Sequence, residues 1–393
     1  MAKWYFSSTF LLFLGNWIGQ IALNWYAFQM NHNAMDLALL NFFRLIPIFL
    51  LSLWAGGLAD RYCRCKLIKW SVASSCVVTT TLTVLVFSIG NVPMFVLFSY
   101  AFLRGSLSAL ETPVRQAVLP DLSTKLPVSK AVSYNAFILN ICRSIGPAIS
   151  GFIIALYGSA YAFLLQAVVY GISLLLSLPL YFKATQLKRV RGLSFTVAKQ
   201  YLKIHIQGRN IFLTSLVIMA TGYSYTTMLP ILTDAHFPNN ASVFGTAMTI
   251  SAIGGVIATL VLPHIIDYTK NNHLYFFSSI GFGIGLLSLF KANVMTLFIV
   301  IFFVGMFGQL ARTSNRVFFQ NDIEPEHRGK ILSVIMIDRG MIPLGAMLLS
   351  LITDWIGITP TFLIMGITTM SIAILGYVVN QKYIGGPLRN ETH

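Results

Sequence analysis

The sequence predicts an all-α membrane protein with twelve transmembrane helices in two six-helix bundles, and three observations predict this fold class. Hydrophobic residues make up 56% of the chain and charged residues 10%, and the mean hydropathy of +0.74 exceeds that of soluble domains of this size. Apolar segments long enough to cross a hydrocarbon core about 30 Å thick recur along the chain. A long basic segment divides them six and six.

The order of the apolar segments sets the expected elements. They are expected near residues 6–29, 36–58, 67–90, 93–118, 131–157, 159–182, 210–233, 242–265, 273–290, 294–319, 331–353 and 359–381. The first is expected to stay as a helix rather than to be removed as a signal peptide, because no small-residue cleavage site follows a short apolar core. We therefore expect an N-terminal bundle over 1–182, a basic cytoplasmic linker over 183–209, and a C-terminal bundle with a short cytoplasmic tail over 210–393.

The formal net charge of +15 is distributed in a way that favours a membrane protein over a nucleic-acid-binding protein. Most of the 27 basic residues fall in segments that would share one side of the membrane, and the linker contains seven of them and no acidic residue. Lys and Arg in short loops mark the cytoplasmic side. We expect both termini to be cytoplasmic and the protein to span the bacterial plasma (inner) membrane.

No residue pattern indicates a cofactor, a metal site or an enzyme. Cys63 and Cys65 lie two positions apart without a second pair of ligands, and the other cysteines and the histidines are scattered. The phosphate-binding pattern G-x-x-x-x-G-K-[ST] does not occur, so ATP is not the expected energy source. We expect a transporter that uses no cofactor and holds no metal.

A charged segment between the second and third helices is expected to act as a cytoplasmic gate. Its residues at fixed spacing are Gly57, Asp60, Arg61, Arg64 and Lys66. Asp60, at a helix end, can pair with Arg61, with Arg115 of the fourth helix or with the N-terminus of a neighbouring helix, which would hold the cytoplasmic side closed. The alternative is an ordinary cluster of cytoplasmic loop charges.

The fourth helix carries charges at membrane depth. Arg104, Glu111 and Arg115 follow one another at i, i+7 and i+11, which is one face of an α-helix. Charges within a bilayer are costly and usually face a cavity or a partner, so Arg44, Arg104 and Arg143 are candidates for substrate binding. A static network of ion pairs is the alternative.

Uncharged polar residues add candidates for the lining of a substrate cavity. Asn16 and Gln20 lie one turn apart on a face of the first helix that Asn24 shares. Gln166 and Tyr223 lie in the sixth and seventh helices. Hydrogen bonds between helices explain these residues equally well.

Small residues interrupt the fifth helix at Gly146, Pro147 and Gly151. Glycine and proline weaken a membrane helix and let a neighbouring helix approach closely. A packing kink without a role in transport is the alternative to a functional motif.

The two halves of the chain repeat a sequence pattern, as expected of a duplicated fold. Residues 112–122 correspond to residues 313–323, and Arg115 and Arg316 are 201 residues apart.

These motifs resemble signatures of the major facilitator superfamily. Residues 57–66 resemble its loop signature G-x-L-A-D-R-x-G-R-K, with Cys63 in place of the second glycine. Residues 142–151 resemble its antiporter signature G-x-x-x-G-P-x-x-G-G, which accompanies exporters. The run over 111–147 looks like the transmembrane secretion effector branch, which includes the enterobactin exporter and macrolide-type efflux pumps. The resemblance implies the major facilitator fold and transport by alternating access.

Proton coupling requires a titratable group, and the resemblance does not supply one in the first helix. Where this branch often has an acidic residue after a glycine, this chain has Asn16. Of the acidic residues within or near the membrane, Glu111 and Asp338 are the candidates for proton coupling.

The sequence indicates a proton-coupled exporter of a small, anionic organic molecule such as a siderophore, because arginines outnumber acids at the depth of the expected cavity. A broad drug or macrolide efflux pump is the alternative within transport, and a non-transporting membrane sensor or assembly factor is the alternative from another class. The expected partners are a small-molecule substrate, protons and the lipid bilayer. We expect a monomer and no binding of nucleic acid.

The gate assignment predicts the effect of Asp60→Asn. The substitution should weaken the state that is closed toward the cytoplasm, because the carboxylate would no longer pair with a basic group. Transport should fall while the amount of protein in the membrane stays the same, and cysteines should become more accessible to reagents from the cytoplasmic side. Unchanged transport together with unchanged accessibility would leave only a topological charge cluster.

Overall fold

The computed structural model describes residues 1–122, 128–181, 194–238, 240–266, 271–291, 293–323 and 328–384. Within these residues the secondary structure is helical and includes no strand. The predicted all-α class is confirmed for this part of the chain.

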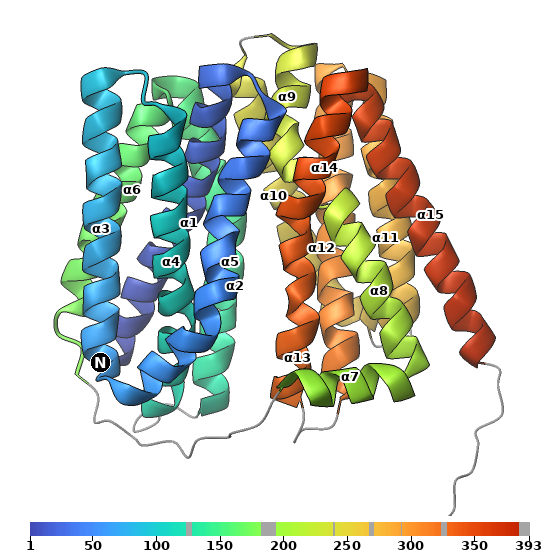
Figure 1. The fold of residues 1–393 in the computed structure, drawn as a ribbon, viewed down its shortest axis with the longest axis horizontal. Helices are drawn as coiled ribbons and strands as arrows, with labels where there is room; N and C mark the ends of the chain where they lie inside the picture. The colour runs from blue at the N-terminus through green and yellow to red at the C-terminus, as the bar shows by residue number, and fades with distance from the viewer. Residues whose placement is uncertain are drawn as a thin grey trace, which may run out of the picture. The chain divides into compact units, whose positions relative to one another are not determined.

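The first half of the chain forms long helices joined by short connections (Figure 1). They are α1 (Ala2–Asn31), α2 (Ala34–Arg61), α3 (Arg64–Ile89), α4 (Met94–Val118), the 3₁₀ helix η1 (Leu119–Leu122), α5 (Val128–Tyr157) and α6 (Ser159–Ser177).

The second half contains shorter and more interrupted helices. They are α7 (Ser194–Ile204), α8 (Ile206–Thr221), α9 (Tyr225–His236), α10 (Ala241–Ile266), α11 (Asn271–Ser288), η2 (Leu289–Lys291), α12 (Val294–Asp322), α13 (Arg328–Ile335), η3 (Met336–Gly340), α14 (Met341–Ile356) and α15 (Ile358–Ile384).

Contacts divide the chain into two compact units, which we describe separately. Unit 1 comprises Met1–Arg189 and Thr227–Ala252, and unit 2 comprises Val190–Thr226 and Ile253–His393. Both α9 and α10 therefore contribute residues to each unit. The division at 182 and 210 that the sequence suggests stays a prediction.

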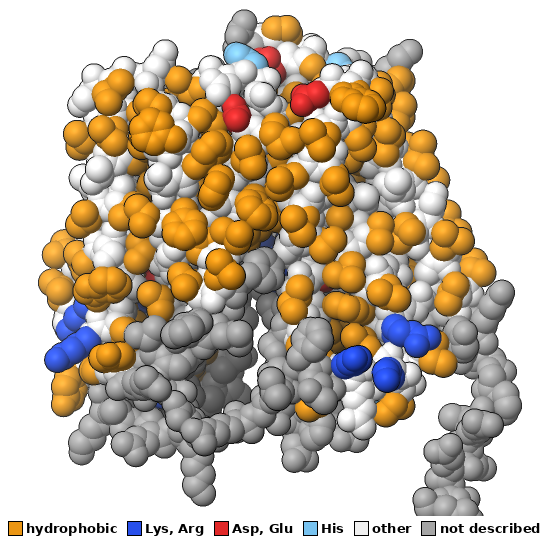
Figure 2. All heavy atoms as spheres, viewed as in Figure 1, with side chains coloured by type: hydrophobic (Ala, Val, Ile, Leu, Met, Phe, Trp, Pro, Cys, Tyr) orange, Lys and Arg blue, Asp and Glu red, His pale blue; other side chains and the backbone are white. Residues whose placement is uncertain are grey.

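Eight helical segments among the described residues are long and apolar enough to cross a membrane. They are Ala2–Asn31, Arg64–Ile89, Phe137–Tyr157, Ser159–Ser177, Ile206–His236, Ser242–Leu262, Val294–Asp322 and Ile358–Gln381. On the face shown in Figure 2, hydrophobic side chains cover the middle of each unit, and Lys and Arg side chains lie near the lower ends. The chain is a multi-pass membrane protein, and the count of twelve helices stays a prediction.

In unit 1, α1 lies against α5 and α6, and α2 lies against α4. The α2–α4 pair packs closely because Gly105 of α4 faces the backbone of Arg44 in α2, where an added Cβ would overlap the Arg44 carbonyl. Small residues allow this backbone approach in membrane helices. The contact places Arg44 and Arg104 on adjacent helices.

Two of the helices expected from hydropathy are interrupted in unit 2. The expected helix over 210–233 is broken between α8 and α9, where the backbone turns at residues 222–224. The expected helix over 331–353 is divided into α13, η3 and α14. Pro343 contributes to the second break, because it has no N–H to donate to the carbonyl four residues earlier. Hydropathy does not register such breaks because it is averaged over a window much longer than the few residues in each break.

The close contact at Gly105 predicts that Gly105→Ala lowers stability. The methyl group would meet the Arg44 carbonyl and force α2 and α4 apart, and overpacking of this kind costs about 1–3 kcal/mol. The thermal unfolding midpoint of the purified protein in detergent should fall.

Gly171→Ala is the matched control, because an added Cβ at Gly171 of α6 would meet nothing within 4 Å. This control should leave the unfolding midpoint within a degree or two of the unsubstituted protein. Equal midpoints for the two variants would show that α2 and α4 have room to adjust.

Candidate functional site

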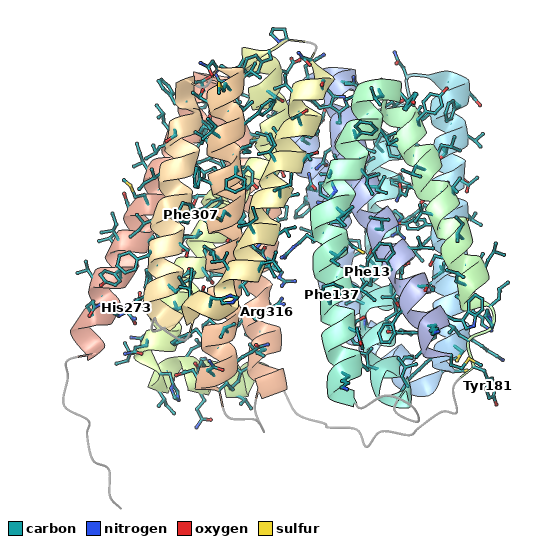
Figure 3. All side chains as sticks on the ribbon, turned by 180° about the vertical axis from the view of Figure 1, so that it is seen from behind. Phe13, Phe137, Tyr181, His273, Phe307 and Arg316 are labelled. Carbon is teal, nitrogen blue, oxygen red and sulfur yellow. The ribbon has the colours of Figure 1, made fainter. Side chains whose placement is uncertain are left out.

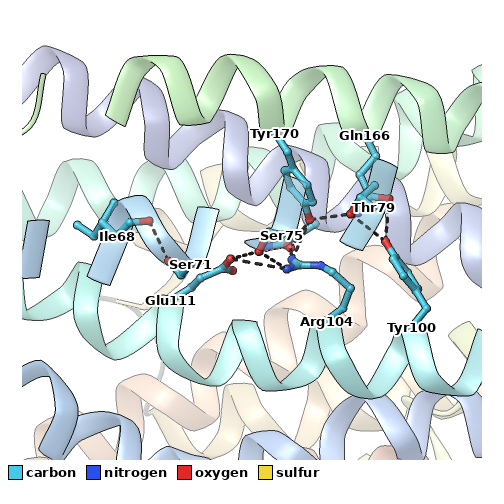
Figure 4. A network of polar contacts seen from close by, with 10 residues as sticks. Ile68, Ser71, Ser75, Thr79, Tyr100, Arg104, Glu111, Gln166 and Tyr170 are labelled. Carbon is cyan, nitrogen blue, oxygen red and sulfur yellow. Dashed lines mark hydrogen bonds and ion pairs between the residues drawn. The ribbon is translucent and has the colours of Figure 1, made fainter. Parts of the chain in front are cut away.

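A buried arginine joins four helices of unit 1. Arg104 of α4 is 5% exposed, and its Nη1 donates to the Ser75 hydroxyl of α3 at 2.6 Å. Its Nη2 donates to the Tyr170 hydroxyl of α6 at 2.8 Å and to the Asn16 amide oxygen of α1. The guanidinium carbon also lies 5.0 Å from the centre of the Tyr170 ring. Figure 4 shows this network from close by.

Glu111 supplies the negative charge of this network. Its Oε1 accepts a hydrogen bond from the Ser75 hydroxyl at 2.6 Å and lies 3.6 Å from Nη1 of Arg104. Its Oε2 is buried and has no hydrogen-bond partner among the described residues. One carboxylate oxygen is therefore engaged by Ser75 and Arg104, and the other has no hydrogen-bond donor among the described residues.

Further hydrogen bonds extend the network from Tyr170. Gln166 Nε2 donates to the Tyr170 hydroxyl at 3.1 Å, and the Tyr100 hydroxyl donates to Gln166 Oε1 at 3.3 Å. The Tyr100 hydroxyl also lies 3.3 Å from that of Thr79. All four side chains are buried, so their polar groups depend on one another rather than on water.

A second arginine lies beside this network but is less enclosed. Arg44 is half-buried, and its Nη2 donates to Gln20 Oε1 at 2.8 Å. Arg44 is close enough to Arg104 for the two positive charges to repel each other. Of the charged side chains that form this site, two are therefore positive and only Glu111 is negative.

Four of the predicted site residues thus meet in one network, namely Asn16, Arg104, Glu111 and Gln166, and Gln20 and Arg44 pair beside it. Four residues of the network were not among the predicted site residues, namely Ser75, Thr79, Tyr100 and Tyr170. A sequence signal existed for two of them, because Ser71, Ser75 and Thr79 recur every four residues and form a buried polar stripe on α3.

Arg115 lies one turn beyond Glu111 on α4, close enough to attract its charge, and packs against α1. Its Nη1 donates to the Thr9 hydroxyl at 2.7 Å and its Nη2 to the Ser8 hydroxyl at 3.2 Å. The Tyr5 hydroxyl donates to the Arg115 carbonyl at 2.6 Å. Arg115 is 2% exposed, so its described contacts fix α4 to α1.

The remaining gate residues are described in part. The side chains of Gly57, Asp60 and Arg61 lie outside the described residues, and so does the pairing predicted for Asp60. Arg64 is buried at the start of α3, and Lys66, two residues further on, is exposed. The gate stays a prediction.

The glycines of α5 lie at close helix contacts in unit 1. An added Cβ at Gly146 would overlap Trp17 of α1, and one at Gly151 would approach the Cα of Gly245 in α10 to 2.6 Å. Pro147 lies between them within the helix. The motif therefore lets α5 approach two neighbours, which is compatible with a functional motif and with simple packing. Arg143 is half-buried on the same helix.

Tyr223 and Asp338, the predicted site residues of the second half, lie in unit 2. The Tyr223 hydroxyl donates to the Gly308 carbonyl, and the Arg312 guanidinium carbon lies 4.3 Å from the centre of the Tyr223 ring. Asp338 is 5% exposed in η3. The sequence analysis did not include Arg312 in the site, although Arg312 and Arg316 lie one turn apart on α12 and share a face.

The described residues show no metal site. No group of three or more His, Cys, Asp or Glu side chains among them is arranged to hold a metal ion, and the four cysteines are free.

Comparison with solved structures shows which fold these helices form. The nucleoside transporter NupG matches with a TM-score of 0.76 and 14% identity over 97% of this chain and 99% of that chain. A bacterial homologue of the iron transporter ferroportin in an inward-facing state matches with a TM-score of 0.71 and 14% identity over 98% of both chains. At these identities the similarity shows the fold alone.

Comparison with known sequences shows the family. The staphyloferrin A transporter of Staphylococcus aureus is 53% identical over 384 residues, which cover 97% of both chains. Macrolide efflux protein A of Streptococcus pyogenes is 24% identical over 92% of this chain and 91% of that protein. A sequence profile described as transmembrane secretion effector matches residues 2–384. The chain belongs to the transmembrane secretion effector family of the major facilitator superfamily, as its motifs indicate, and is a transport protein rather than an enzyme.

Proposed function

We propose that this chain is a proton-coupled secondary active exporter of a small anionic siderophore, working by alternating access between two six-helix bundles. The observation that carries the proposal is the 53% identity with the staphyloferrin A transporter across 97% of both chains. We take the substrate to be staphyloferrin A or a molecule of the same class.

The topology belongs to the same proposal. We propose twelve helices, cytoplasmic termini, a monomeric state and a place in the bacterial plasma (inner) membrane. The support for this topology is that Lys66, Lys199, Lys203 and Arg209 are all exposed in segments expected on the cytoplasmic side.

The charge balance in unit 1 supports an anionic substrate. Arg44 and Arg104 lie close together with only Glu111 of opposite charge in their network. Arg104 already has four side-chain partners, so it would act mainly through its field and by orienting Asn16. Arg44 is half-buried and bonded to Gln20, which makes it the better candidate for direct contact with a substrate carboxylate.

Glu111 is the carboxyl group that we propose for proton coupling, and its Oε2 has no hydrogen-bond partner among the described residues. A substrate carboxylate that reaches Arg44 and Arg104 would compete with Glu111 for their positive charge, so the substrate and Glu111 would act on the same arginines.

A broad-specificity drug or macrolide pump is the second candidate. It is supported by the 24% identity with macrolide efflux protein A, which covers 92% of this chain. Export of a bulky cationic dye that does not depend on Arg44 would favour this candidate. A non-transporting sensor or assembly factor is the third candidate, and transport of any substrate by the purified protein would eliminate it.

Arg44→Ala is expected to reduce siderophore export by about tenfold or more, because a charge-assisted hydrogen bond to the substrate would be lost. Arg44→Lys should retain part of the export, since lysine keeps the charge but not the planar fork of donors. The measurement is siderophore in the medium, beside efflux of a cationic dye from the same cells.

Lys130→Ala is the control for this comparison, because Lys130 is an exposed basic residue at the start of α5. It should leave export unchanged. Robust dye export without siderophore secretion, insensitive to Arg44→Ala, would overturn the siderophore assignment in favour of the multidrug pump.

Glu111→Gln is expected to uncouple efflux from the proton gradient, because the amide keeps the shape of the side chain but cannot take up a proton at Oε2. Substrate accumulation in inside-out vesicles with an imposed pH gradient should fall to the level seen without the gradient. Glu111→Asp keeps a carboxylate and should retain part of the coupling. If Glu111→Gln and Asp338→Asn both keep full proton-driven accumulation, coupling to protons is wrong.

A further inference from the structure

Unit 2 contains two helix breaks that contact each other. The turn between α8 and α9 meets the start of α14, where the Ser224 hydroxyl donates to the Ile342 carbonyl at 2.8 Å. Helix α8 also contacts η3. Ser215 of α8 lies within hydrogen-bonding reach of Asp338 in η3. Irregular backbone among apolar membrane helices is tolerated where it is buried in protein or lines a cavity, and substrate sites of transporters are commonly formed at such breaks.

Three arginines lie near these two helix breaks. Arg312 and Arg316 lie one turn apart on α12, and Arg339 lies in η3 next to Asp338. The charges of Arg312 and Arg316 both repel that of Arg339. Figure 3 labels Arg316 below Phe307 along the second unit, toward the end of α12. Arg316 and Arg339 are exposed, and because a guanidinium group is costly to place against lipid, we expect them to face water, where a dissolved anion can reach them.

The charge of this cluster is incompletely balanced by the described residues. Asp338 attracts both Arg316 and Arg339 and is attracted by Arg312, so one carboxylate is shared by three guanidinium groups. Arg312 rests on the ring of Tyr223, and its Nε atom is buried without a hydrogen-bond partner among the described residues. A buried donor of a charged group without a partner is costly.

The internal repeat explains how unit 2 differs from unit 1. The offset of 201 residues that relates Arg115 to Arg316 also relates Glu111 to Arg312. In unit 1 this position holds the carboxylate that neutralises Arg104, whereas in unit 2 it holds another base. The arginine cluster of unit 2 therefore needs an anion from outside.

We propose that Arg312, Arg316 and Arg339 form a binding site for a molecule with two or more carboxylate groups. Guanidinium groups bind carboxylates through paired hydrogen bonds, and arginines one helical turn apart suit two carboxylates of one molecule. Asp338 acts as the internal counter-anion, which a ligand carboxylate replaces. We take this ligand to be the exported anion, and in this respect the inference rests on the proposed function.

Citrate is a suitable probe because it is a small tricarboxylate. Acetate, a monocarboxylate, and inorganic phosphate, another kind of anion, serve as comparison ligands. Citrate binding to the purified full-length protein in uncharged detergent is measured by titration calorimetry. Arg316→Ala and Arg339→Ala should each weaken citrate binding about tenfold, as expected for the loss of charge-assisted hydrogen bonds. Asp338→Asn should strengthen it, because the competing internal anion is removed.

Arg209→Ala is the matched control, since Arg209 is an exposed arginine of α8 in the same unit and outside the cluster. It should bind citrate as the unsubstituted protein does, and thermal unfolding checks that each variant is folded. The opposite directions expected for the arginine and Asp338 variants separate a specific site from general loss of structure. Citrate affinity that is unchanged in Arg316→Ala and Arg339→Ala, or matched by acetate or phosphate, would overturn the inference.

The citrate-binding experiment tests the arginine site, and the secretion experiment tests the proposed function, so the two can fail independently. If cells secrete no siderophore but citrate binding depends on the arginines, the site stands and the exporter assignment is wrong. If secretion occurs and citrate binding does not depend on the arginines, the site is wrong and the exporter assignment stands.

Discussion

The burial of Arg104 is the constraint on which the interior of unit 1 depends. An arginine stays charged, and moving that charge out of water costs several kcal/mol unless hydrogen bonds and an opposite charge compensate for it. Here the compensation comes from α1, α3, α6 and from Glu111 on the same helix. Each of these helices must therefore keep its position relative to α4, and the close α2–α4 contact at Gly105 brings Arg44 to the edge of the same network.

In unit 2, the positive charge of the arginines is balanced less completely. Three arginines share one buried carboxylate, and one of them stacks on an aromatic ring rather than on an acid. Such stacking contributes about 0.5–2 kcal/mol, which is less than the cost of burying a charge. The helix breaks near Tyr223 and Asp338 fit this arrangement, because polar backbone groups freed at a break can help to solvate a charge in an apolar bundle.

The sequence predicted those features that depend on composition and on spacing within one helix. Hydropathy identified the membrane class, and the spacing of Arg104 and Glu111 by seven residues placed them on one face of α4, where they form an ion pair. It could not identify partners from other helices, such as Ser75 and Tyr170, because those contacts depend on how helices pack. The same limit applies to Arg115, whose hydrogen bonds to Ser8 and Thr9 of α1 the sequence did not indicate.

A duplicated fold offers a physical reason for the difference between the two units. Two identical halves would each neutralise their own arginines and leave no charge for a substrate. At one repeat position Glu111 of unit 1 is replaced by Arg312 in unit 2, so the carboxylate near the arginines of unit 2 comes from Asp338 of η3 instead. In the proposed exporter, Glu111 would be the proton-coupling group of unit 1, and the three arginines of unit 2, which share Asp338, would bind the anion. The two proposed tasks would then depend on different side chains of a single chain, so a substitution in one half could change one task without removing the side chains that serve the other.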